Sequence, residues 1–565
     1  MSAHPLPYPL RAPRSTPESR HGAPPAPRQE TRPGMLIDRD IEVPTRAGRT
    51  VQIDVYRPET GDPAGVLIAW SPYGKHDPAP IGQIYPTSGA KPEWMSDLTT
   101  FEGPDPVFWV PRGYAVVIAD IPGTWYAKGP ASYVSPEEAE DFADLIEWAG
   151  IQPWSNGRVG LTGVSYLTVA QWRVAGLNPP HLAAINPWEG WSDTYREVAR
   201  HGGIPETSFW PYIWERWGAS TGQIEDLERE DREHPFFDDF WASKAADLEA
   251  VTVPAFVVAS WTDQGLHTRG TLEGFRRISS PQKWLYVHGA KKWAEYYRPE
   301  MVEMQAAFFD HFLLGRSTEV TDWPPVRLEL RERYGRGTFV EGTSWPLPDV
   351  TYRTFHLDAS TGTMSTRPVE TESTATYHGL GDPFVPSRVV FEHRFEEATD
   401  IVGHARLTLY AEAPDAPDMD VFVGLFKRDA AGEIVPFAYY AQFEDGPAAL
   451  GWLRASHREL DPERSTDYLP VLAHRRSLPL ESDGPTRLDI EVLPSGTRFA
   501  AGESLVLVVQ GHDIKHYPKP LVYARHETDI NRGPQVLHTG GRFDARLTVP
   551  ELPADAPVTR RRDRA

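Results

Sequence analysis

Ser165 lies where a buried strand gives way to a helix, in the sequence Gly163-Val164-Ser165-Tyr166. The apolar residues before this turn predict a short strand, and the residues after it predict a helix. A serine at such a turn projects its hydroxyl beyond the sheet edge, where backbone N–H groups of the helix start can bind a developing oxyanion. Gly163 permits the sharp turn because it has no Cβ. The pattern indicates a nucleophilic serine, although a serine that only caps the helix would have the same local sequence.

A nucleophilic serine requires a base and an acid. In α/β proteins with a serine at such a strand-to-helix turn, the acid follows the serine along the chain and the histidine follows the acid. Asp263 follows one predicted strand, and His288 follows the next. A neutral imidazole can accept the serine proton at pH 7. His267, only four residues after the acid, and His311, inside a predicted helix, are placed less well. Asp263 could instead be a surface-turn residue, and His288 could simply end its strand.

Positioning these side chains requires a parallel sheet covered by helices, because the candidate strands are apolar on both faces. The predicted strands span 66–70, 115–119, 158–162, 182–186, 255–260 and 284–287, after a hairpin of 36–43 and 50–57. The clearest predicted helices span 136–149, which begins with the capping box Ser135/Glu138, and 301–314.

The chain divides into five predicted parts. They are a disordered Pro- and Arg-rich tail (1–34), an α/β catalytic domain (35–188 and 251–322), a helical cap or lid (189–250), an all-β sandwich of jelly-roll type (323–553) and a disordered tail (554–565). The lid prediction rests on aromatic residues in an insertion between strands, which ordinary helix packing would also explain.

Composition excludes several classes of protein. The 565 residues carry a formal charge of −22, which disfavours nucleic acid as a partner. The chain has no cysteine, hence no disulfide and no thiolate metal site, and neither a metal nor a cofactor is expected. No membrane span or secretory signal is visible, so a cytoplasmic location and a small-molecule substrate are expected. Whether the chain forms a homo-oligomer stays open.

Several separate segments are similar to one known family. The region 146–168 resembles the nucleophile region of the CocE/NonD hydrolases, the S15-like family of cocaine esterase and X-Pro dipeptidyl-peptidase. Further resemblances are Ser71-Pro-Tyr-Gly-Lys75, 308–315, 344–348 and 451–457. The resemblance covers about residues 36–553. It implies an α/β-hydrolase fold with a helical lid insertion, followed by a C-terminal jelly roll.

The resemblance also implies an activity and a set of site residues. Ser165 would be the nucleophile, Asp263 the orienting acid and His288 the base. The Tyr73 hydroxyl and the backbone N–H of Tyr166 would form the oxyanion hole, although a buried core tyrosine is an alternative for Tyr73. The expected reaction is cleavage of an ester, or less readily an amide, through an acyl-enzyme.

Three positions depart from the family pattern. Thr168 stands where the family usually has glycine, and Asp120-Ile-Pro-Gly123 replaces an Asp-x-Arg-Gly loop. Trp293, which cannot accept a proton, stands where many members have the base. Lys291 and Lys292 precede it, and lysines are protonated at pH 7. His288 could serve as the base only if its loop were shifted.

The substrate is less well defined by the sequence. A bulky apolar acyl group is favoured by tryptophans expected near the site, namely Trp125, Trp188, Trp191, Trp210 and Trp261. Glu189, Asp193 and Glu197 could bind the α-ammonium of a peptide or amino ester, or could be solvated charges on a helix face. The alternatives are therefore an X-Pro dipeptidyl-peptidase, an amino-ester hydrolase or acyltransferase, and, if the base is lost, a non-hydrolytic binding or biosynthetic protein.

Overall fold

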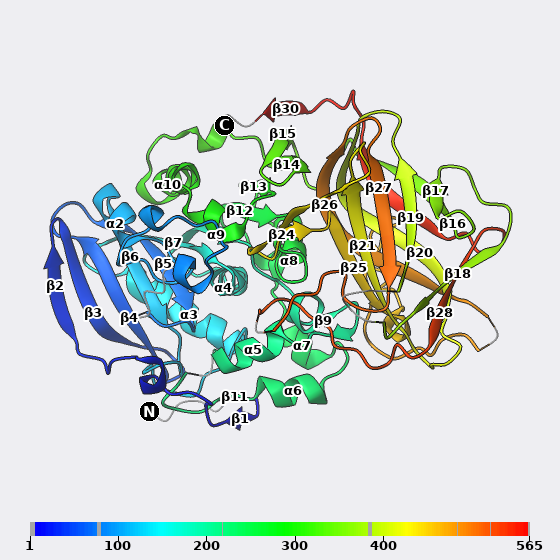
Figure 1. Ribbon diagram of the computed structural model, residues 1–565. Coiled ribbons are helices and arrows are strands. Elements are labelled where there is room, and N and C mark those ends of the chain that lie inside the picture. The colour runs from blue at the N-terminus through cyan, green and yellow to red at the C-terminus, as the bar shows by residue number, and fades with distance from the viewer. Residues whose placement is uncertain are drawn as a thin grey trace.

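The computed structural model describes residues 6–75, 81–216, 219–381, 387–482, 484–519 and 521–562. Figure 1 shows two regions side by side: a sheet with helices, coloured blue to green, and a region rich in β-strands, coloured yellow to red. None of the helices in the described part of the chain combines the length and the apolar composition needed to cross a bilayer.

The central sheet is mixed, with a parallel middle and antiparallel edges. In spatial order its strands are β2 (Arg28–Arg32), β3 (Met35–Pro44), β4 (Thr50–Pro58), β6 (Tyr114–Asp120), β5 (Ala64–Ser71), β7 (Ser155–Val164), β8 (Leu182–Trp188), β12 (Ala255–Ser260), β13 (Lys283–His288), β14 (Val326–Arg333), β15 (Arg336–Gly342) and β30 (Thr559–Arg562). The strands from β6 to β14 run parallel, and β6, β8 and β12 are buried almost throughout, as expected for a sheet covered on both faces. The predicted strands up to residue 287 are confirmed.

Helices pack on this sheet. They include α3 (Pro136–Gly150), α4 (Tyr166–Gly176), α8 (Thr268–Arg277), α9 (Lys292–Tyr297) and α10 (Pro299–Leu314), with the one-turn helices α1 (Ile81–Ile84) and α2 (Pro106–Trp109). The two helices expected from the sequence are confirmed as α3 and α10. The Ser135 side chain accepts from the Glu138 N–H, as the capping box predicts, but the Glu138 carboxylate accepts from the N–H of Val134 rather than of Ser135.

Both predicted tails are wrong over the described residues. Near the N-terminus, β1 (Leu10–Arg11) pairs with β11 (Ile224–Glu225), and β2 pairs with β3. Near the C-terminus, β30 pairs with β15. Strand pairing satisfies the backbone of these segments, which the Pro- and Arg-rich composition did not reveal. Residues 1–5 and 563–565 lie outside the described residues.

The boundary expected near residue 323 cuts through the central sheet. The strand β14 begins at Val326 and pairs in parallel with β13, and β15 continues the same sheet. The α/β region therefore extends to Gly342, about 20 residues further than the pattern of apolar runs in the sequence indicated.

Residues 189–250 form an insertion between β8 and β12. It contains the π-helical turn Tyr195–Ala199, the strands β9 (Arg200–His201) and β10 (Ile204–Pro205), and the helices α5 (Phe209–Arg216), α6 (Leu227–Glu233) and α7 (Asp239–Ser243). In Figure 1 the insertion lies beneath the sheet and reaches the β-rich region.

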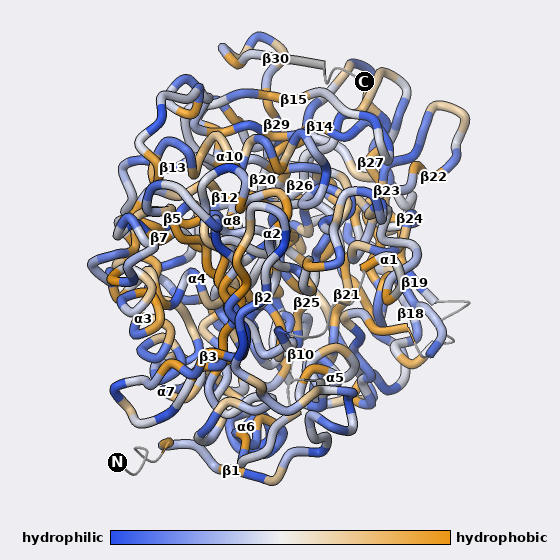
Figure 2. Tube along the Cα trace, turned by 90° about the vertical axis from the view of Figure 1, so that its left-hand side faces the viewer, coloured by the Kyte–Doolittle hydropathy of each residue, from blue (hydrophilic) through white to orange (hydrophobic). Residues whose placement is uncertain are grey.

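The C-terminal region has its own hydrophobic core. Its strands pair mainly antiparallel, although Thr363 and Glu392 lie in a parallel pair. The strands are β16 (Thr351–Asp358), β17 (Thr363–Ser365), β18 (Ser373–His378), β19 (Arg388–Arg394), β20 (Thr399–Glu412), β21 (Asp420–Arg428), β22 (Ile434–Val435), β23 (Phe437–Tyr439), β24 (Phe443–Gly446), β25 (Ala449–Arg454), β26 (Thr486–Phe499), β27 (Ser504–Gln510), β28 (Pro534–Thr539) and β29 (Arg546–Leu552). Figure 2 shows hydrophobic residues concentrated along central strands such as β5 and β7.

Candidate active site

Ser165 lies at a sharp turn between β7 and α4. Its backbone has φ 61° and ψ −116°, a conformation that non-glycine residues rarely adopt. Gly163 has φ 132°, and a Cβ there would lie 2.2 Å from the Leu167 side chain. The sequence predicted the sharp turn, and the strand and helix on either side hold Ser165 in this strained conformation. Its side chain is nearly buried but lines a cavity.

His267 is the histidine that the structure places beside Ser165. Its Nε2 lies 3.2 Å from Ser165 Oγ, and its Nδ1 lies 2.5 Å from Oδ2 of Asp263. A carboxylate only accepts hydrogen bonds, so the proton of the neutral ring belongs on Nδ1. Nε2 then accepts from the serine hydroxyl. The three side chains therefore form a connected relay from hydroxyl to imidazole to carboxylate.

Asp263 and His267 meet because a single helical turn follows β12. The His267 N–H donates to the Asp263 carbonyl at 2.9 Å, so the two side chains stand four residues apart on one face. Gly265, with φ 90°, lies between them. The helix α8 then begins at Thr268. Both groups are almost fully buried, at 1% and 0% exposure.

The pairing of His288 with Ser165 and Asp263, which the sequence predicted, is wrong. His288 ends β13, where its Nε2 lies 3.0 Å from Oε1 of Glu189 and its Nδ1 accepts from the Ala290 N–H. Ser260 donates to the other oxygen of Glu189 at 2.5 Å. Burial alone would lower the pKa of His288, but the hydrogen bond and charge of Glu189 outweigh it and raise that pKa. Both ring nitrogens thus have other partners.

A lysine stands beside the relay. Lys292, the first residue of α9, places Nζ 3.0 Å from Asp263 Oδ2 and 3.3 Å from His267 Nδ1. Burial would raise the pKa of Asp263, but the charges of Lys292 and His267 lower it below its usual range. The pKa of His267 is lowered, by burial first and by Lys292 second. Asp263 is therefore held as a carboxylate and His267 as a neutral imidazole.

Tyr73 lies in the loop after β5 and lines the same cavity as Ser165. Its hydroxyl lies near Ser165, the backbone of Tyr166 and Glu102, and all three affect its pKa. Burial raises the Tyr73 pKa well above its usual value, and the charge of Glu102 raises it further, so the phenol stays protonated. The loop is held by Asp120, whose carboxylate accepts from the Lys75 N–H at 2.7 Å.

Glu102 is a buried carboxyl group of the site that sequence reasoning missed. The Trp293 indole N–H donates to Glu102 Oε1 at 2.8 Å. Burial raises the pKa of Glu102 to about 7, against the charge of Lys292, which lowers it. Trp293, which stands where the family pattern has its base, therefore fixes a carboxyl group instead of accepting the serine proton.

The cavity beside Ser165 has a volume of about 50 Å³ and is mostly apolar. Three parts of the chain line it. The α/β region contributes Tyr73, Tyr85, Phe101, Glu102, Ser165, Leu266, Lys292 and Trp293; the insertion contributes Trp191, Phe209, Tyr212 and Ile213; and the C-terminal region contributes Tyr440, Gln442 and Val522.

Of the five tryptophans expected in this pocket, Trp191 lines the cavity. The others occupy different buried positions. Trp125 donates to the Pro72 carbonyl, Trp188 to Asn186 and Trp261 to the Glu329 carbonyl, and Trp210 packs edge-on against Trp214. Tryptophan fills cores as readily as pockets, which the sequence could not distinguish.

Thr168 takes a structural role. Its Oγ1 accepts from the Trp188 N–H at 2.7 Å and lies 2.8 Å from the Trp188 carbonyl oxygen, which joins α4 to the end of β8. Room for its side chain comes from Gly190, where a Cβ would lie 2.6 Å from the threonine. The departure from the family pattern is thus compensated by a second glycine.

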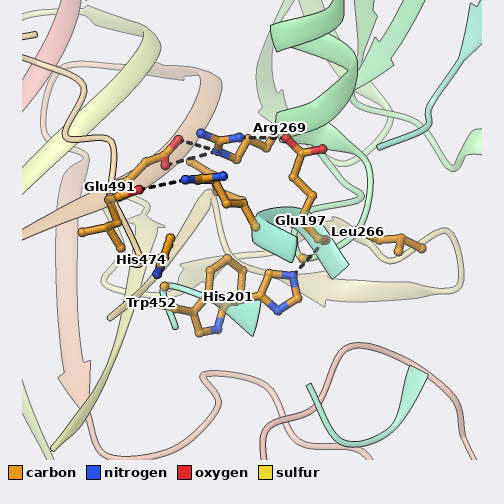
Figure 3. Close-up of a pocket in the computed structure, with 12 residues that line it drawn as sticks. Glu197, His201, Leu266, Arg269, Trp452, His474 and Glu491 are labelled. Carbon is orange, nitrogen blue, oxygen red and sulfur yellow. Dashed lines mark hydrogen bonds and ion pairs between the residues drawn. The ribbon is translucent and has the colours of Figure 1, made fainter. Parts of the chain in front are cut away.

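A second cavity, of about 40 Å³, lies on the other side of Leu266 (Figure 3). Arg269 of α8 joins two carboxylates across it, with Nη1 2.7 Å from Glu197 and Nε 3.1 Å from Glu491 of β26. His201 and His474 line the same cavity. Its arginines are already paired with carboxylates, so the cavity is a charged junction between the insertion, α8 and the C-terminal region.

The three carboxylates proposed to bind an α-ammonium are all occupied. Glu189 faces His288, Asp193 binds Arg196 at 2.7 Å, and Glu197 binds Arg269 and two backbone N–H groups. All three are buried, so the alternative of solvated helix-face charges is wrong as well. Within the part of the chain that the structure describes, no cluster of three or more His, Asp or Glu residues is arranged to hold a metal ion.

Comparisons with known proteins agree with this architecture. Residues 47–225 match the family profile described as X-Pro dipeptidyl-peptidase (S15 family), and residues 318–548 match that of the X-Pro dipeptidyl-peptidase C-terminal non-catalytic domain. Asp263, His267 and Lys292 fall between the two matched ranges.

Individual relatives point to two activities. The chain is 28% identical over 415 residues to a cocaine esterase of a Rhodococcus species, covering 61% of this chain and 68% of that one. It is 25% identical over 339 residues to a putative Xaa-Pro dipeptidyl-peptidase of Bacillus anthracis, covering 53% and 54%. Among solved structures, a CocE/NonD family hydrolase from Staphylococcus aureus has a TM-score of 0.88 and 41% identity, over 92% of this chain and 94% of that one.

Proposed function

Because the chain belongs to the CocE/NonD family of hydrolases, we propose that it is a serine carboxylic-ester hydrolase that works through an acyl-enzyme. One observation carries the proposal: His267 contacts Ser165 Oγ through one ring nitrogen and Asp263 through the other. This contact also argues against the non-hydrolytic alternative, whose premise was the loss of the base at Trp293.

The proposed reaction begins with Ser165. Its Oγ attacks the ester carbonyl carbon while its proton moves to His267 Nε2. Asp263 stays ionised, keeps the other ring proton on Nδ1 and stabilises the imidazolium. The imidazolium then gives its proton to the leaving alkoxide, and the acyl group stays on Ser165. A water molecule then attacks the acyl-enzyme in the same way, giving its proton to His267, and the carboxylic acid product leaves as Ser165 takes that proton back.

Negative charge develops on the carbonyl oxygen in both steps. The Tyr73 hydroxyl and the Tyr166 backbone N–H are proposed to bind it, since both lie beside Ser165 at the start of α4. The raised pKa of Tyr73 supports this role, because a phenol that stays protonated can donate throughout the cycle.

The cavity favours an ester with a compact apolar acyl group. Aromatic side chains from three parts of the chain make up most of its wall, and its volume is about 50 Å³. The insertion 189–250 is proposed to act as a lid, because Phe209, Tyr212 and Ile213 cover the cavity. We place the C-terminal strands in a jelly roll, on the strength of their antiparallel pairing and the family resemblance.

An amine-bearing substrate is the second candidate. Glu102 lines the cavity next to Ser165, and a carboxylate there could bind an α-ammonium group. Because the pKa of Glu102 is about 7, it would be only partly ionised at neutral pH. The three carboxylates expected from the sequence are engaged elsewhere, which makes a dedicated ammonium pocket the weaker proposal.

The test compares substrates on the purified protein. We expect hydrolysis of p-nitrophenyl esters of short unbranched, branched and aromatic acids, with slower or no release from Xaa-Pro p-nitroanilides. Ser165→Ala should abolish this activity while the free energy of unfolding changes by no more than about 1 kcal/mol. Faster cleavage of the anilides than of every ester would replace the esterase proposal with the peptidase. Full activity in Ser165→Ala would overturn both.

A further inference from the structure

The acid of the proposed triad has two hydrogen-bond donors on one oxygen rather than one, and the second donor is a cation. Oδ2 of Asp263 receives the His267 Nδ1–H at 2.5 Å and Lys292 Nζ at 3.0 Å. The same ammonium lies 3.3 Å from His267 Nδ1. A relay of serine, histidine and aspartate needs no fourth ionisable group, so the presence of a buried lysine in van der Waals contact with the base requires an explanation.

The charge of Lys292 is balanced by groups from several elements. Asp263 comes from the loop after β12, Glu102 from the loop before α2 and Glu189 from the end of β8. Burial would lower the pKa of Lys292, but these carboxylates together raise it. From the C-terminal region, Tyr439 and Tyr440 face Asp263, and burial keeps both phenols uncharged. Lys292 is therefore protonated at the bottom of the cavity.

We propose that Lys292 is a positioning residue of the relay, which holds Asp263 in place and keeps His267 neutral and in the productive tautomer. This inference rests on the proposed function of Ser165, His267 and Asp263.

Lys292 acts on Asp263 and His267 in two ways. An ammonium bound to Oδ2 fixes the carboxylate that receives the Nδ1 proton, so that Nε2 is left to accept from Ser165. An ammonium also disfavours a second positive charge on the adjacent ring, which shifts the protonation of His267 to lower pH. The relay gains a base that is ready in mildly acidic solution, at the cost of a weaker proton acceptor.

Lys291 offers a matched control one residue away. Its Nζ is directed elsewhere, to the Thr87 carbonyl at 2.7 Å and to Glu444 at 2.6 Å. Substituting Lys291, the N-cap of α9, changes the net charge by the same amount at the adjacent position without removing a contact to Asp263 or His267.

The experiment measures the rate of Ser165 labelling by a small fluorophosphonate between pH 4.5 and 9. The labelling rate should rise with pH as His267 loses its proton and then reach a plateau. In Lys292→Met this rise, the acidic limb, should move to higher pH by at least about one unit, and the rate on the plateau should be close to that of the wild type. Lys292→Arg should move it much less, and Lys291→Met should leave it in place. The same series in a Glu102→Gln background assigns the limb to His267, because that background lacks the carboxyl that titrates near pH 7.

The outcomes separate the two proposals. If the labelling rate of Lys292→Met rises at the same pH as that of the wild type and is slowed equally at every pH, the positioning role is overturned and a structural role is left. Wild-type protein that is not labelled, or labelling that persists in His267→Ala, would instead overturn the proposed function. If Lys292→Met does not fold, Lys292→Gln provides the same comparison, because it keeps a donor for Asp263 without the charge.

Discussion

At the scale of single residues, the proposed chemistry depends on a base that is four positions from its acid. His267 is buried, and its environment lowers its pKa through burial and through Lys292. Tyr73 is kept protonated by burial and by Glu102. Each of these two side chains thus has the protonation state that its proposed role needs at neutral pH.

The first prediction concerns the oxyanion donor. Tyr73→Phe removes the hydroxyl that faces Ser165 while keeping the ring that packs on Phe101 at a centroid distance of 5.1 Å. We expect kcat for an activated ester to fall by about 10²–10³-fold with little change in thermal stability, the usual effect of losing one oxyanion donor. An unchanged kcat would return Tyr73 to a packing role.

The second prediction concerns pH. Only neutral His267 can accept the serine proton, and its pKa is lowered, so kcat/KM should rise through an apparent pKa below the usual histidine value of about 6.5 and then level off. The measurement uses a neutral ester, in the wild type and in Glu102→Gln. A limb above pH 7 in both proteins would indicate a base with a raised pKa, such as His288.

At the scale of elements, ion pairs hold the helix that follows His267. Arg269 lies two residues after His267 and binds Glu197 of the insertion and Glu491 of β26 (Figure 3). The adjacent loop is held too, because Gln264 accepts from the Leu450 N–H at 2.6 Å and Tyr440 donates its N–H to the Thr262 carbonyl at 2.9 Å. Strands far away in the sequence thus fix the acid and the base.

The third prediction tests this link. Arg269→Met leaves the buried Glu197 and the partly buried Glu491 without their shared cation. We therefore expect the free energy of unfolding to fall by about 3–5 kcal/mol, which a lower Tm would report. Glu491→Gln keeps the pair of Arg269 with Glu197 and should cost much less. Equal Tm values for the two variants would mean that the junction contributes nothing specific.

The elements that hold the nucleophile could be predicted from the sequence, and those that hold the base could not. Ser165 lies in a local strand-turn-helix pattern. The strands of the surrounding sheet are continuous apolar runs, which predict buried strands clearly. The base was misassigned because His288 ends a strand, as the usual chain order requires. The contacts that favour His267, with Ser165 from another element and Lys292 from α9, are long-range and leave no local pattern. The i, i+4 spacing of Asp263 and His267 was the available signal.

At the scale of the whole molecule, the cavity exists because three regions meet. Residues 318–548 match a profile named for a non-catalytic domain, yet Tyr440, Gln442 and Val522 line the cavity beside Ser165. The C-terminal region therefore shapes the space available to a substrate.

The fourth prediction follows from this arrangement. Tyr440→Ala should enlarge the cavity and shift the preference among p-nitrophenyl esters toward longer or bulkier acyl groups, chiefly through KM, while Ser165 remains labelled by a fluorophosphonate. An unaltered ranking of esters would show that the C-terminal region does not contact the acyl group.

In the proposed reaction His267, and not His288, activates Ser165. The most direct measurement is the rate of fluorophosphonate labelling of Ser165 at pH 7.5 in His267→Ala and His288→Ala, each checked for folding. We expect the labelling rate to fall by at least about 10³-fold in His267→Ala. We expect His288→Ala to be less stable, since Glu189 keeps Ser260 but loses the imidazole, and we expect the folded protein to be labelled within about tenfold of the wild-type rate. Rapid labelling of folded His267→Ala, together with no labelling of folded His288→Ala, would contradict the assignment of His267 as the base.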